Sequence, residues 1–120
     1  MLSADAAHEP NRAVWQLAHE SVHLIAPNSG GPALVVEEGL ASLFADEVAA
    51  EHNLGFQQDV PAYIEAAQST GEWLKQHPGA VCRIRKKQPS FQQWSPALLL
   101  SSCEGMTVEL ASALCQPFKK

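Results

Sequence analysis

Residues 19–23 read His-Glu-Ser-Val-His and residues 36–42 read Val-Glu-Glu-Gly-Leu-Ala-Ser, which places Glu38 fifteen positions after His23. Histidines four positions apart lie one turn apart on the same face of a helix. Zinc prefers neutral imidazole nitrogens and carboxylate oxygens, and a catalytic site keeps one position open beside three protein ligands. If both stretches are helical, His19, His23 and Glu38 predict such a site. Glu20 would then lie near the metal and accept a proton from a water held there.

The residues around these two stretches have the apolar spacing of amphipathic helices. The spacing predicts a first helix over residues 10–26, which Pro27 would end. The Gly-rich residues 28–32 then predict a tight turn, and a second helix is expected over about residues 32–53. This reversal would bring Glu38 back across the first helix.

The second half of the chain predicts shorter elements. A third helix is expected from Pro61, with an interruption near Gly71, where residues 69–72 could cap a further segment. Residues 80–85 are the one convincing strand candidate, with Cys82 and Ile84 on one face and the two arginines on the other. Two further helices are expected, one over residues 97–102 after a cap at Ser95 and one over residues 106–115. We therefore predict a mainly α fold, a compact helical domain over residues 1–120 with at most one or two short strands.

Composition and charge limit the classes of protein. The 120 residues are 46% apolar and contain no stretch as long as a membrane span, so we expect one soluble domain without a membrane partner. Residues 1–9 have no secretory pattern, which favours a cytoplasmic location. A net charge of −5 argues against nonspecific nucleic-acid binding, although residues 83–87 form a local basic cluster. The three cysteines form no CxxC pair and are expected to be reduced thiols.

Residues 18–23 together with residues 38–44, Glu-Gly-Leu-Ala-Ser-Leu-Phe, resemble the active-site and glutamate helices of gluzincin metallopeptidases. The likeness is greatest to the aminopeptidase-N-like branch and to the small minigluzincins. It implies a zinc-dependent peptidase acting on a peptide or protein, in which His19, His23 and Glu38 bind Zn²⁺ and Glu20 is the general base and acid.

The resemblance also implies supporting residues. In this family a residue one turn after the glutamate ligand often supports the first histidine, and Ser42 occupies that place. Relatives often stabilise the oxyanion with a downstream Tyr or His, for which Tyr63 is the candidate, followed by His52, His77 and Arg83. A lone tyrosine on a helix can equally be a core residue with its hydroxyl at the surface.

Several alternatives remain open at the level of sequence. The histidines could be surface residues of an exposed helix, and Glu37 or Asp46 could be the third ligand in place of Glu38. Gluzincins pair the substrate backbone with a strand that precedes the HExxH helix, and only about a dozen residues precede it here. The alternative function is therefore a non-catalytic, metal-binding helical interaction module. A partner chain or an oligomer could also supply the missing edge.

Overall fold

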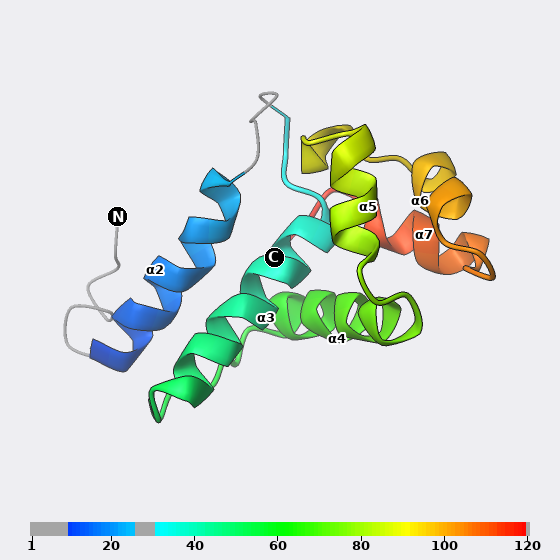
Figure 1. Cartoon of the computed structure of the whole chain (residues 1–120). Helices are drawn as coiled ribbons and strands as arrows, with labels where there is room; N and C mark the ends of the chain where they lie inside the picture. Colours follow the sequence, from blue (N-terminus) through cyan, green and yellow to red (C-terminus); the bar gives the residue numbers. More distant parts are fainter. Residues whose placement is uncertain (1–9, 26–30, 120) are drawn as a thin grey trace.

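The computed structural model describes residues 10–25 and 31–119, and this part of the chain is mainly helical, as predicted (Figure 1). It forms six α-helices and one 3-10 helix: α2 (Pro10–Leu24), α3 (Val35–Glu51), α4 (Pro61–Gln76), α5 (Ala80–Lys87), η1 (Phe91–Gln93), α6 (Pro96–Ser102) and α7 (Val108–Leu114). Within the described residues there is no sheet, only one isolated antiparallel bridge between Leu34 and Pro117. The expected turn at residues 28–32 lies mostly outside the described residues, as do Pro27 and residues 1–9.

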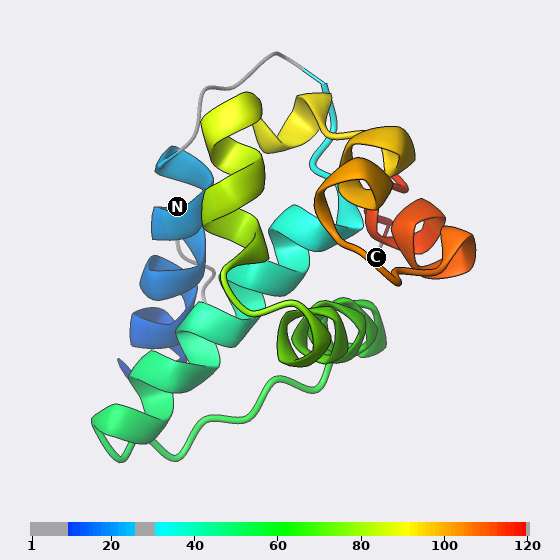
Figure 2. The same cartoon turned by 45° about the vertical axis from the view of Figure 1, so that its right-hand side comes forward.

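Helix α3 is the central element of the fold. It runs beside α2 in the opposite direction and crosses α4 on its other side (Figures 1 and 2). Its buried positions lie on more than one face and are mostly small or acidic: Val36, Glu37, Glu38, Gly39, Ala41, Ser42, Ala45 and Ala49. A helix that is buried on two sides lacks a single apolar stripe.

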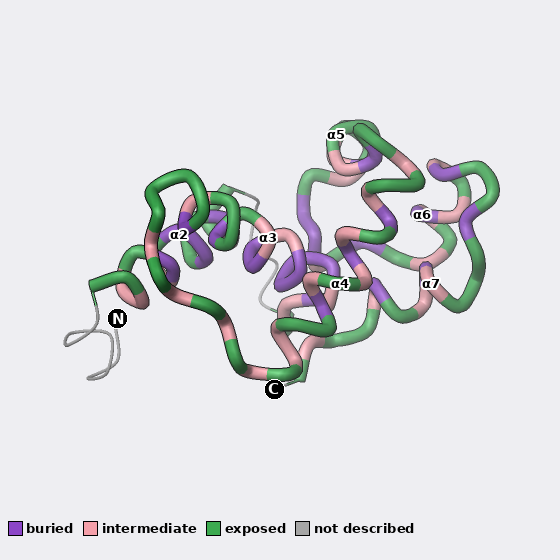
Figure 3. The backbone as a smooth tube through the Cα atoms, turned by 90° about the horizontal axis from the view of Figure 1, so that it is seen from below, coloured by how far each residue is buried: buried purple, intermediate pink, exposed green. Residues whose placement is uncertain are grey.

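The contact between α2 and α3 is a small core of its own. Trp15 and Ala18 of α2 pack against Ala45 and Ala49 of α3. Along α2, buried residues alternate with exposed ones (Figure 3). Alanines on α3 let the two helices approach closely, so that polar side chains from both can meet between them.

The crossing of α3 and α4 depends on Gly39. A Cβ atom at this position would lie 2.5 Å from the backbone oxygen of Ala66 and closer still to the side chain of Thr70. Glycine is therefore the residue that fits at this point of the Glu-Gly-Leu-Ala-Ser stretch.

The main core lies at the other end of α3. It joins the start of α3 to α4, α5, η1, α6 and α7 through Trp73, Ile84, Phe91, Leu99 and Leu114, which are all almost completely buried. The segment after α7 pairs with the residues at the start of α3. The amide nitrogen of Val35 donates to the backbone oxygen of Gln116, and that of Phe118 donates to the backbone oxygen of Ala33, both at 2.8 Å. No helix of the described residues is long and apolar enough to cross a membrane.

The predicted strand at residues 80–85 is wrong, because these residues form helix α5. Ala80 and Ile84 are both completely buried, which is the four-residue spacing of a helix, whereas Cys82, expected on the same face as Ile84, is exposed. Gly79 adopts a left-handed conformation with a φ of 78° directly before the helix, and basic residues occupy its last turn, where they complement the helix dipole.

The predicted interruption near Gly71 is also wrong. Helix α4 is continuous from Pro61 to Gln76, and the neighbouring Thr70 is completely buried. Glycine within a helix costs about 1 kcal/mol, and here the packing of α4 on α3 outweighs it. The cap at Ser95 is confirmed, because its hydroxyl accepts a hydrogen bond from the amide of Leu98 at 3.2 Å.

Candidate metal centre

Two histidines of α2 and one glutamate of α3 meet where the two helices lie side by side. Nε2 of His19 lies 2.9 Å from Oε2 of Glu38, and Nε2 of His23 lies 3.1 Å from Oε1 of the same carboxylate. Their ligand atoms all lie within 4.8 Å of one another. His19 and Glu38 are buried and His23 is partly buried. These three residues could hold a metal ion.

The spacing of these atoms is compatible with a metal ion. In a tetrahedral zinc site with bonds of about 2.0–2.1 Å, neighbouring ligand atoms are about 3.3 Å apart. The 2.9 and 3.1 Å contacts run to the two different oxygens of Glu38 and are slightly shorter than that spacing. The three ligand atoms lie within 4.8 Å of one another, so the side chains would have to shift to surround an ion. Nδ1 of His19 is buried and makes no hydrogen bond within the described residues, which leaves Nε2 as the atom that points to the shared carboxylate.

Glu37 makes a contact that the sequence reasoning missed. Its Oε2 lies 2.6 Å from Nδ1 of His23, and the residue is 6% exposed. An ionised carboxylate can only accept, so Nδ1 carries the proton and Nε2 faces Glu38. Glu37 therefore orients His23 rather than taking the place of Glu38 in the three-residue cluster. Two adjacent acidic residues in the first turn of α3 were the available signal.

The same contacts set the charges of the cluster. Hydrogen bonds to Glu37 and Glu38 raise the pKa of His23 to about 10. Burial alone would raise the pKa of Glu38, but hydrogen bonds from His19 and His23 lower it to about 2. Without an ion, the cluster therefore holds a proton on His23 at neutral pH. A metal ion would have to displace that proton, because only the neutral imidazole binds metals.

The predicted catalytic residues Glu20 and Tyr63 lie on different helices beside this cluster. Glu20 follows His19 on α2 and is exposed. Tyr63 of α4 reaches the site, because its ring stands edge-on to the ring of His19 with the centroids 5.3 Å apart. Ser42 lies one turn after Glu38 and is buried, but its hydroxyl has no hydrogen-bond partner among the described residues, so the expected bond to His19 is not formed.

The other predicted candidates lie elsewhere. His52 and His77 follow the last residues of α3 and α4, and the guanidinium of Arg83 donates to the backbone oxygen of Pro78. Asp46, an alternative ligand by sequence, accepts a hydrogen bond from the indole of Trp15 at 2.8 Å. None of them belongs to the three-residue cluster.

Comparisons of the chain with protein-family models, with curated proteins and with solved structures found no match. The functional argument therefore depends on the geometry of the cluster and its surroundings.

Proposed function

We propose that the chain is a zinc-dependent peptidase of minimal gluzincin type, in which His19, His23 and Glu38 bind the zinc ion and Glu20 is the general base. The observation that carries the proposal is the convergence of two imidazoles and one carboxylate within 4.8 Å. Two nitrogens and one oxygen form the donor set of several catalytic zinc sites. A zinc ion held in this way acts as a Lewis acid that polarises a carbonyl and makes water more acidic.

The residues around the cluster have separate roles in the proposed reaction. The exposed carboxylate of Glu20 accepts a proton from the water whose oxygen attacks the peptide carbonyl, and it returns that proton to the amine when the C–N bond breaks. The hydroxyl of Tyr63 donates a hydrogen bond to the carbonyl oxygen, which becomes negative during the attack. Glu37 accepts a hydrogen bond from Nδ1 of His23, so Nε2 is the nitrogen that would face the ion once its proton is displaced.

The alternative is a metal-binding helical interaction module that does not hydrolyse peptides. One observation favours it, namely that residues 10–25 and 31–119 contain no strand to which a substrate backbone could add. A strand from a partner chain or a second copy would remove this objection.

Zinc content tests the metal site. We expect about one zinc per chain in the wild type and a large loss in Glu38→Ala after dialysis against a weak chelator, because a carboxylate ligand is removed. Glu51→Ala, at the exposed last residue of α3, serves as the matched control and should keep its zinc. Equal, near-stoichiometric zinc in wild type and Glu38→Ala would overturn the three-ligand assignment.

Peptide cleavage tests the reaction. The zinc-loaded wild type should cleave a mixed peptide library, and Glu20→Gln should keep the zinc and lose at least a hundredfold in rate, about what a general base contributes. Equal cleavage by both proteins would refute the role of Glu20. Stoichiometric zinc without any cleavage, measured also at concentrations that favour oligomers, would support the interaction module.

A further inference from the structure

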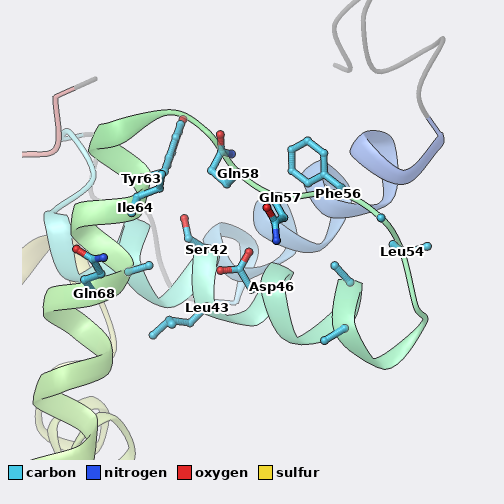
Figure 4. A pocket seen from close by; sticks show the side chains of 14 residues that line it. Ser42, Leu43, Asp46, Leu54, Phe56, Gln57, Gln58, Tyr63, Ile64 and Gln68 are labelled. Carbon is cyan, nitrogen blue, oxygen red and sulfur yellow. The ribbon is translucent and has the colours of Figure 1, made fainter.

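A pocket of about 780 Å³ lies between α3, the segment that follows it and the start of α4 (Figure 4). It adjoins the candidate metal centre through two of its lining residues. Ser42 lies one turn after Glu38 on α3, and the ring of Tyr63 packs against the ring of His19. A peptide held at the metal centre would therefore have this pocket beside it.

The lining combines apolar walls with one charge. Leu43, Leu54, Phe56 and Ile64 provide apolar surface, and glutamine side chains lie among them. Among the described residues that line the pocket, Asp46 is the only charged one, and none is Lys, Arg or His. A pocket of this kind favours a long apolar chain that ends in a positive charge.

The position of the Asp46 carboxylate is fixed from outside the pocket. Its Oδ1 accepts a hydrogen bond from the indole nitrogen of Trp15 at 2.8 Å, while the residue as a whole is exposed. Figure 4 shows Asp46 and Ser42 extending from α3 toward the segment that carries Gln57 and Gln58. The carboxylate therefore remains open to a ligand and does not have to be ordered by it.

Phe56 forms a wall that is supported from its outer side. Its ring packs at a tilt of 53° against the ring of Trp15 with a centroid distance of 5.6 Å, and the guanidinium of Arg12 lies 5.0 Å from its centroid. Arg12 is not among the residues that line the pocket. Arg12 therefore contacts Phe56 from outside the pocket, and inside the pocket the negative charge of Asp46 favours a positively charged ligand.

We propose that this pocket binds a lysine or arginine side chain of a peptide whose backbone lies at the metal centre. The methylene groups pack between the apolar walls, and the cationic end reaches Asp46. The proposal rests on the peptidase function proposed above, because it names the class of substrate that the same site prefers.

Binding can be measured without metal or hydrolysis. The probes are three blocked pentapeptides, alanine at every position except a central lysine, norleucine or glutamate, added to the full chain carrying Glu20→Gln. Because Trp15 donates to Asp46, its indole N–H signal in NMR reports on a ligand there. We expect the lysine peptide to bind about two- to fivefold more tightly than the norleucine peptide, within the range of a partly exposed ion pair, and the glutamate peptide to bind weakest.

Two variants separate the pocket charge from the overall charge. Asp46→Asn keeps an oxygen that can accept from Trp15 but removes the negative charge, so the preference for lysine over norleucine should fall to about one. Glu47→Gln removes a neighbouring exposed charge that does not line the pocket, and it should leave the preference unchanged.

Equal binding of the lysine and norleucine peptides to the chain with Asp46 intact would overturn the proposal. So would a preference that survives Asp46→Asn, or one that is lost equally in Glu47→Gln. Because this measurement uses neither zinc nor cleavage, its result stays valid even if the hydrolysis experiments fail. Conversely, cleavage without any lysine preference would refute the pocket assignment alone.

Discussion

Replacing Gly39 by alanine should destabilise the protein, although alanine is the better helix former. The new Cβ would lie 2.5 Å from the backbone oxygen of Ala66, and a comfortable contact requires roughly 1 Å more. The obstacle is the backbone of α4, which cannot turn aside as a flexible side chain does. Overpacking of this kind costs about 1–3 kcal/mol, and the higher helix propensity of alanine returns up to about 1 kcal/mol. Because the obstacle is backbone, the cost should lie in the upper part of that range, about 2–3 kcal/mol, which leaves a net loss of about 1–2 kcal/mol in the free energy of unfolding.

Urea unfolding followed by circular dichroism measures this change, and Gly71→Ala is its matched control. Among the described residues, a Cβ at Gly71 would meet only the side chain of Leu43 at 3.8 Å, an ordinary contact, so this variant should gain about 0.5–1 kcal/mol. The two glycine-to-alanine changes, on two packed helices, therefore have opposite predicted signs. A Gly39→Ala protein that is as stable as the wild type would refute the close crossing of α3 and α4.

Three further predictions concern the cluster and the helix ends. Glu37→Gln should weaken zinc binding about tenfold to a hundredfold, as the loss of a group that orients a ligand does, while Glu47→Gln should not; equal affinities by competition with a chelator would contradict the role of Glu37. In the metal-free chain, the raised pKa of His23 contributes stability that is fully present below pH 6.5 and is lost as the pH rises through about 10. The lowered pKa of Glu38 contributes stability that is fully present above pH 4.5 and is lost as the pH falls through about 2. The urea midpoint should therefore fall both at high pH and at low pH, and Glu38→Gln should reduce the fall at low pH. Ser95→Ala removes the cap of α6 and should cost about 1 kcal/mol, measured in the same assay; an unchanged midpoint would show that the 3.2 Å bond to Leu98 does not contribute.

The first two helices were predictable because local signals agree there. Apolar spacing, Pro27 and the Gly-rich turn predicted a helix, a reversal and a second helix, and α2 and α3 lie close to the expected bounds. At residues 80–85 the local signal was ambiguous, because six residues are too few to separate a period of two from one of 3.6. The left-handed Gly79 and the burial of Ala80 with Ile84 resolve it, and burial depends on the tertiary fold.

In the candidate site, too, part of the arrangement was predictable from the sequence and part was not. The spacing of His19, His23 and Glu38 predicted that they would meet, and the structure brings them together. The role of Glu37 was missed because neighbouring residues of an isolated helix point about a hundred degrees apart. In the folded chain His23 lies between the two carboxylates and contacts one with each ring nitrogen. That geometry depends on the relative rotation of α2 and α3, which no short motif encodes.

The position of Gly39 directly after Glu38 links the stability of the fold to the site in a specific way. Glu38 faces α2, whereas Gly39 contacts α4, so the donor cluster and the close crossing lie on different sides of the same helical turn. A displacement of α4 would carry Tyr63 and one wall of the pocket with it, and the contacts between α2 and α3 would persist. Gly39→Ala should therefore impair peptide binding and cleavage more than zinc affinity. Glu38→Ala should instead lower zinc affinity and leave the crossing of α3 and α4 intact. Zinc titration and peptide binding by the two purified variants compare these effects, and equal losses of zinc affinity would show that the two sides of α3 act as one unit.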